Sequence, residues 1–155
     1  MKRHESLVEL SKDHHEGLLL AVRLQQGPRA LLRLWSHDPV WQCEFIVRFW
    51  DEHLRMHFAA EEQHVFPMAV RLLSNANLVT QLKKEHAQMR AMIEEFRKNG
   101  TTLGKEHLTE KLKEFGSLLE NHIRCEEREF FPLCEHHFPD DAKHELLAAM
   151  ASYRD

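Results

Sequence analysis

Two stretches of the chain carry the same side chains at the same spacing. Residues 57–67 read His-Phe-Ala-Ala-Glu-Glu-Gln-His-Val-Phe-Pro, and residues 122–132 read His-Ile-Arg-Cys-Glu-Glu-Arg-Glu-Phe-Phe-Pro. Only in these two stretches does a Glu follow a His by four residues. On an α-helix, residues four apart lie on one face, so the imidazole and the carboxylate can converge on one point. This is a spacing that metal ligands use on the helices of a bundle.

The repetition extends to the segment before each stretch. Residues 10–14, Leu-Ser-Lys-Asp-His, resemble residues 82–86, Leu-Lys-Lys-Glu-His, so the chain reads as two halves, about 10–73 and 82–139. Each half has one lone His and then a His/Glu pair. The inward polar residues that this pattern predicts are His14, His57, Glu61, His86, His122 and Glu126. Burying two carboxylates without counter-charge is costly, so the pattern implies cations or local exposure.

Four imidazoles and two carboxylates suit two ions of a first-row transition metal. Imidazole binds Fe, Zn, Cu or Ni, whereas Mg and Ca prefer sites made of oxygen ligands. If each ion takes one His from each of two helices and both Glu bridge, each ion has four protein ligands and open positions. Two divalent cations outweigh two carboxylates, so a bound hydroxide, oxide, peroxide or other anion is favoured. Such a site therefore has open coordination positions at which a small molecule can bind and react.

Long helices must position these residues, and the apolar periodicity predicts four of them. Their predicted ranges run from a Ser6 or Ser11 cap to Gly27-Pro28, from an Asp38 cap and Pro39 to about Phe66, over 78–98, and over 105–131. A shorter amphipathic piece covers 140–153, and 29–35 is expected to be a helical connector. No segment has the alternation typical of strands. We predict an all-α, antiparallel four-helix bundle with a short C-terminal helix.

Three residues are expected to interrupt or end these helices. Pro67 and Pro132 lack the donor that an interior helical position needs, so we expect a kink or break at the first and a helix end at the second. Gly100 stands where a left-handed C-terminal cap is expected.

The bulk composition describes one ordinary globular domain of residues 1–155. A mass of 18.4 kDa fits a single core, and a net charge of -4 gives no reason to expect nucleic acid or an anionic membrane as partner. No apolar run approaches the roughly 20 residues of a membrane span. The first residues lack the apolar core of a secretory signal, which predicts a cytoplasmic protein. Three cysteines without a CxxC pair argue against a disulfide framework or a thiolate zinc site.

The paired motifs, the two lone histidines and the order of the helices resemble the hemerythrin-like family, also called HHE cation-binding domains, over about 14–132. The resemblance implies an up-down-up-down bundle around a non-haem di-iron centre, with two iron ions and a bridging oxo or hydroxo group. It also implies a role for each of the six residues. The terminal ligands would be His14, His57, His86 and His122, and the bridges would be Glu61 and Glu126.

One position departs from the oxygen-carrying members of that family. Those proteins have a second His four residues after the His of the third helix, where this chain has Arg90. The change argues against reversible oxygen transport. The four-His, two-Glu set is similar instead to the di-iron domain of repair-of-iron-centres proteins, whose separate cysteine-containing domain has no counterpart in this sequence. Arg90 could turn inward to bind an anionic ligand, or outward to pair with Glu94, which we favour.

Four further residues lie near the predicted ligands. His53 and His64 fall on the ligand face of their helix, where either could supply another imidazole, hydrogen-bond a carboxylate or line the approach. Glu62 and Glu127 point about 100° away from the preceding glutamates. We interpret them as surface residues or as hydrogen-bond partners of the ligands.

Three functions are compatible with this pattern. The leading one is a di-iron protein that binds or turns over O2, NO or peroxide in a stress response or in iron handling. The second is an iron- or gas-sensing or iron-donating module without turnover. The third is a structural bundle with zinc or no metal. The expected ligand is a small diatomic or peroxide, no residue is identified as catalytic, and the oligomeric state, a homodimer included, stays open.

Overall fold

The computed structural model describes residues 2–26, 35–151 and 153. In these residues the regular structure is entirely helical, with no strand, which confirms the predicted all-α class. The helices are α1 (Glu5–Gln26), α2 (Pro39–Phe49), α3 (Arg55–Ala60), α4 (Phe66–Leu72), α5 (Ala76–Asn99), α6 (Lys105–Cys125), α7 (Phe131–His137) and α8 (Asp140–Met150). Widened π-helical turns join α2 to α3 (Trp50–Leu54), α3 to α4 (Glu61–Val65) and α6 to α7 (Glu126–Phe130).

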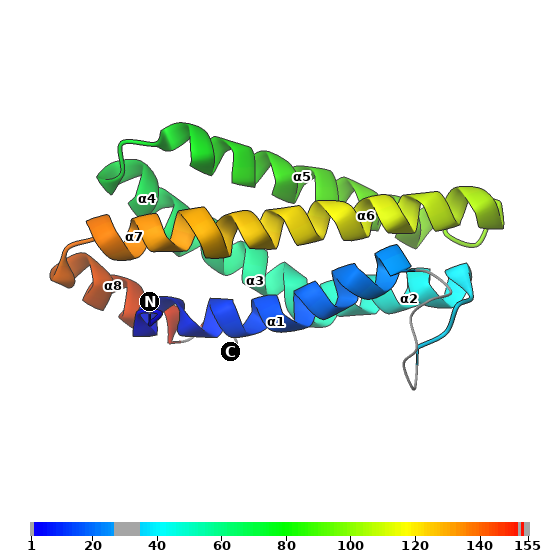
Figure 1. Ribbon diagram of the computed structural model, residues 1–155, viewed down its shortest axis with the longest axis horizontal. Helices are drawn as coiled ribbons and strands as arrows, with labels where there is room; N and C mark the ends of the chain where they lie inside the picture. The colour runs from blue at the N-terminus through cyan, green and yellow to red at the C-terminus, as the bar shows by residue number, and fades with distance from the viewer. Residues whose placement is uncertain (1, 27–34, 152, 154–155) are drawn as a thin grey trace.

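These pieces form four antiparallel rods, namely α1, α2 to α4, α5, and α6 with α7 (Figure 1). α1 packs along α6, α5 packs against both α2 and α6, and α2 also contacts α6. α8 turns back to lie against α1 and the π-turn that begins at Glu61. None of the described helices is long and apolar enough to cross a membrane.

The starts of α2 and α5 follow from the local sequence, whereas α1 begins at Glu5, so Ser6 and Ser11 lie within it and do not cap it as predicted. Asp38 accepts a hydrogen bond from the Val40 backbone N–H at 3.1 Å, and α2 begins with Pro39 as predicted. Asn75 caps α5 in the same way, with the Leu78 N–H as donor at 3.3 Å. α1 ends at Gln26, directly before the predicted stop. The predicted connector lies outside the described residues except for Trp35, which is buried and not helical.

Pro132 does not end its helix, contrary to the prediction, and at Pro67 the predicted interruption takes the form of a π-turn after which the helix continues. α4 continues past Pro67 to Leu72, and α7 continues past Pro132 to His137. Each proline follows a π-turn that the preceding phenylalanine closes by donating its N–H to a carbonyl five residues back. The wider turn accommodates the ring, which would otherwise clash with a carbonyl one turn earlier.

Gly100 is not a left-handed cap, because its φ of -57° and ψ of -32° are those of a right-handed helix. The glycine is required by close packing instead. A Cβ atom there would lie 2.5 Å from Cys43 Sγ and 2.6 Å from the Phe96 carbonyl oxygen.

Gly100→Ala should therefore lower the free energy of unfolding by about 1–3 kcal/mol, because the added methyl group overpacks this contact. Urea denaturation measures the change. Gly104→Ala is the control, since a Cβ at Gly104 meets nothing within 4 Å, and it should be close to neutral. Equal unfolding midpoints for the two variants would contradict the packing argument.

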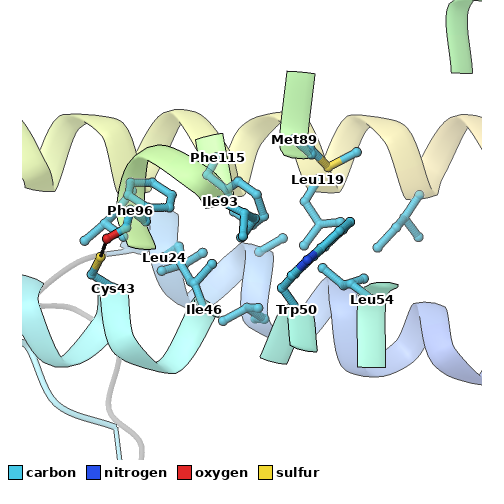
Figure 2. Packing of buried hydrophobic residues seen from close by; sticks show 14 of the residues in the cluster. Leu24, Cys43, Ile46, Trp50, Leu54, Met89, Ile93, Phe96, Phe115 and Leu119 are labelled. Atoms are coloured by element: carbon cyan, nitrogen blue, oxygen red, sulfur yellow. Dashed lines mark hydrogen bonds between the residues drawn. The ribbon is translucent and has the colours of Figure 1, made fainter. Parts of the chain in front are cut away.

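Two apolar clusters fill the bundle and leave a layer between them. One cluster includes Leu24, Ile46, Trp50, Ile93 and Phe115 (Figure 2). The other lies toward the opposite end of each rod and includes Leu7, Leu10, Phe66, Phe130 and Leu146. Along every rod the break between the two clusters falls at the predicted ligands. The apolar packing thus fixes the place of a polar layer.

Candidate metal centre

The structure brings all six predicted ligands together in that layer. None of them is more than 3% exposed. The histidines come from α1 (His14), α3 (His57), α5 (His86) and α6 (His122), and the two glutamates are the first residues of π-turns (Glu61 and Glu126). All four rods therefore contribute to the same site.

The ligand atoms form two overlapping groups, and in each group they lie within 4.8 Å of one another. One group holds His14 and His57 with both glutamates, and the other holds His86 and His122 with the same glutamates. Among the described residues these are the two groups of His, Cys, Asp and Glu that could hold a metal ion. Sharing of both carboxylates is the arrangement expected of two adjacent metal positions.

Each glutamate approaches the Nε2 atom of one imidazole from each group. The nitrogen-to-oxygen distances are 3.2 Å for His57 and Glu61, 3.4 Å for His86 and Glu61, 3.2 Å for His14 and Glu126, and 3.1 Å for His122 and Glu126. The two Nε2 atoms of the second group, those of His86 and His122, lie 3.1 Å apart. Every imidazole thus presents the same nitrogen to the centre of the layer.

Several of these buried atoms have no hydrogen-bond partner. They are both carboxylate oxygens of Glu61, both of Glu126, and Nε2 of His14. Leaving a buried polar atom unsatisfied costs about 1–3 kcal/mol, so five such atoms in one layer need an explanation. Transition-metal ions bound by imidazole nitrogen and carboxylate oxygen would satisfy them. The residues present therefore fit a pair of metal ions.

A second layer of carboxylates holds the outer nitrogen of every imidazole. The Nδ1-to-oxygen distances are 2.7 Å for His14 and Glu127, 3.0 Å for His57 and Asp13, 2.6 Å for His86 and Glu62, and 2.8 Å for His122 and Glu85. A proton on Nδ1 that is donated to a carboxylate leaves the Nε2 lone pair directed at the site. These contacts fix the tautomer that metal binding requires.

A family model described as the hemerythrin HHE cation-binding domain matches residues 6–134 of the chain. The chain belongs to the hemerythrin HHE family. The matched region includes all six predicted ligands and both repeated motifs of this HHE domain. Comparisons with curated proteins and with solved structures found no match.

Of the four outer acids, the sequence pointed to two. Glu62 and Glu127 hydrogen-bond to His86 and His14, two of the predicted ligands, which is one of the two alternatives given for them. Asp13 and Glu85 were missed. The signal was nonetheless present, because each of these acids stands directly before the lone histidine in the matched segments 10–14 and 82–86.

The additional candidates of the HHE domain do not join the site. His53 is exposed, with its ring 5.2 Å from that of Phe49, and His64 is half-buried. Neither belongs to the two ligand groups found among the described residues. Arg90 takes neither of the two predicted orientations, because its guanidinium contacts Glu62 at 2.8 Å instead. Arg90 of α5 thus contacts the acid that is hydrogen-bonded to His86, one of the predicted ligands.

The buried acids and imidazoles of the HHE domain perturb one another. Burial raises the pKa of Glu61 to about 8, and the nearby charge of Glu126 adds to this rise. Burial alone lowers the pKa of His122, but the nearby charge of Glu126 and the hydrogen bond to Glu85 outweigh it and raise this pKa to about 10. At pH 7 both groups therefore hold a proton when no metal competes for them.

Metal binding to the HHE domain at pH 7 should release roughly two protons, one from Glu61 and one from His122, because metal ligands must be deprotonated. Both pKa values lie above 7, so raising the pH from 6 to 8 removes competing protons and the affinity should increase. Calorimetric titration with Co2+ in two buffers of different ionisation enthalpy measures the protons released. An affinity that stays constant between pH 6 and 8 would contradict this assignment.

Proposed function

We propose that this chain is a non-haem di-iron protein that binds or turns over a small oxidant or gas, O2, NO or peroxide, in a stress response or in iron handling. Each position would take two terminal histidines, His14 with His57 and His86 with His122, and both would share Glu61 and Glu126 as bridges. The observation that carries the proposal is the convergence of six buried ligand residues in two groups that share both carboxylates.

The donor set supports iron as the metal. It consists of imidazole nitrogen and carboxylate oxygen without thiolate, a combination that suits iron among the first-row metals. Membership of the HHE family points to a bound cation, and we propose iron with an oxide or hydroxide bridge. When bound, such a pair supplies open coordination positions and a ferrous/ferric couple.

Burial of the site supports a ligand of only a few atoms. Aromatic rings press on the ligand imidazoles. Phe58 stacks on His86 with ring centroids 3.7 Å apart and planes 5° apart, and Phe131 stacks on His14 with centroids 5.3 Å apart and planes 12° apart. A diatomic molecule or peroxide fits beside such closely covered ligands, whereas an organic substrate would require the rings to move.

The outer acids supply negative charge around the site. Burial would raise the pKa of Glu127, but hydrogen bonds from His14 and Ser11 outweigh it and lower this pKa to about 2. The pKa values of Glu62 and Glu85 are also lowered, because hydrogen bonds to His86 and His122 outweigh their burial. Anions held against the imidazoles make these better ligands and favour the more oxidised metal. This charge supports reaction with oxidants.

The test is metal analysis and spectroscopy of protein from iron-replete cells. We expect two irons per chain, and rapid change of the ferrous spectrum on addition of O2, NO or peroxide, with turnover followed as oxygen evolution or NO loss. Glu61→Ala should lose the iron and the response together. Binding without turnover would favour the sensing or iron-donating alternative. Colourless protein, or an iron protein inert to all three molecules, would overturn the proposal.

A further inference from the structure

Each of the four outer acids has a further partner that holds it in place. The contacts are Tyr153 Oη to Asp13 at 2.8 Å, Arg3 to Glu127 at 2.6 Å, Arg90 to Glu62 at 2.8 Å, and Gln81 to Glu85 at 3.1 Å. Of these donors, only Arg90 was a candidate from the sequence. The four donors continue the chain of hydrogen bonds from the ligand nitrogens outward.

The donors that hold the outer acids differ between the two proposed metal positions. The group of His86 and His122 is supported from within one helix, because Gln81 and Arg90 both lie on α5. The group of His14 and His57 is supported by Ser11 of α1, which donates to Glu127 at 2.6 Å, and by Arg3 and Tyr153 near the two ends of the described chain. Arg3 precedes α1, and Tyr153 follows α8. The approximate twofold relation between the halves therefore breaks at this outer level.

Docking of α8 brings the C-terminal partner into place. α8 packs on α1 and on the π-turn that begins at Glu61, and it lies beside the start of α1 (Figure 1). Leu146 and Met150 of α8 are buried in the apolar cluster at that end of the bundle. Arg3 is held by Glu127 and also contacts Glu135 at 3.3 Å. Both contacts to the outer acids thus require an end of the chain to be docked.

We propose that Arg3 and Tyr153 are positioning residues for one metal position, so that the His14–His57 position depends on the docked chain ends and fills after the His86–His122 position. The supports on α5 belong to one continuous helix, whereas Arg3 and Tyr153 lie outside α1 and α8, so the apparent affinity of the His14–His57 position falls with the fraction of molecules in which these two contacts are not made. The dependence is reciprocal, so metal in the His14–His57 position stabilises the docked ends. The inference rests on the two metal positions of the proposed function.

Variants that keep only one metal position allow the affinity of each position to be measured separately. His122→Ala retains both imidazoles of the His14–His57 position, and His57→Ala retains both of the other. Anaerobic titration with Co2+ alone reports the remaining affinity. Tyr153→Phe should weaken it about three- to tenfold in the His122→Ala protein, by loss of one hydrogen bond to an outer acid, and leave it within about twofold in the His57→Ala protein. Arg3→Met should behave in the same way.

The matched controls are Gln81→Met and Arg90→Met, which should show the reverse selectivity. Circular dichroism of each metal-free variant establishes that the bundle is folded. Tyr153→Phe keeps the aromatic ring, so folding should be retained. Equal losses in both backgrounds, or no loss in either, would overturn the inference.

The single tyrosine of the chain gives an independent readout. Labelling with 3-fluorotyrosine yields one 19F resonance, which should stay in place during the first equivalent of Co2+ and shift during the second. A shift with the first equivalent, or none at all, would overturn the order of filling while leaving a two-metal centre intact. A chain that binds fewer than two equivalents would overturn both this inference and the proposed function.

Discussion

Glu61→Gln should abolish metal binding at both positions, whereas His57→Ala should abolish it at one. Glu61 belongs to both ligand groups, and His57 belongs to only one. Loss of the shared carboxylate removes a ligand and a negative charge from each position, so both affinities should fall by at least about a hundredfold. Metal content after anaerobic ferrous loading and desalting measures the result, with two, one and no ions expected for the parent, His57→Ala and Glu61→Gln.

The same substitution should stabilise the metal-free protein at pH 8. Both oxygens of Glu61 are buried without hydrogen-bond partners, and burial raises the pKa of this acid to about 8. An acid whose pKa is raised in the folded state loses stability as the pH rises from the unfolded value to the folded one. Gln carries no charge, so the free energy of unfolding should increase by about 1–3 kcal/mol.

Glu110→Gln, at an exposed position of α6, is the control for both measurements and should change neither metal content nor stability. A Glu61→Gln protein that retains two ions would exclude shared carboxylates. One that is less stable than the metal-free parent would show that the acid is satisfied by groups within the bundle.

Metal loading should raise the melting temperature by about 10–20 °C. With free metal at a hundred times the dissociation constant, two positions contribute about 5 kcal/mol, and a chain of this size gains about 2–4 °C for each kcal/mol. The expected effect is large because the predicted ligands come from all four rods, so unfolding any rod would remove a ligand from the metal.

Thermal denaturation followed by circular dichroism, with metal and with chelator, measures this stabilisation. The Glu61→Gln protein is the control, and its melting temperature should change by less than about 2 °C between the two conditions. Equal melting temperatures for the parent protein with and without metal would mean that the six side chains do not bind an ion in the folded state.

The elements and the site residues could be predicted because both depend on local spacing. Asp38 and Pro39 mark a helix start through their own backbone preferences, and the structure places the start of α2 there. His57 and Glu61 share a helix face through a four-residue step, and the structure directs both into the polar layer. Their role as metal ligands stays a prediction.

The features that could not be predicted from the sequence depend on contacts between neighbouring helices. Asp13 binds a histidine of α3, and Arg90 binds an acid of the preceding rod, so neither partner can be inferred from residues nearby in the sequence. Gly100 is required by the approach of Cys43 from α2, which its own sequence neighbours do not reveal. Pro132 does not end its helix as predicted, because it follows a π-turn, and a π-turn has no strong local propensity that would indicate it.

The π-turns that begin at Glu61 and Glu126 set the rotational phase of α4 and α7. Each holds one residue more than a regular helical turn, so every later side chain is rotated by about 100° relative to an uninterrupted helix. The segment that bears the predicted ligands and the apolar segment beyond the proline can therefore face the bundle axis in separate registers. Deleting a single residue in such a turn would leave the composition almost unchanged, yet it would turn Phe66 or Phe131 away from the interior.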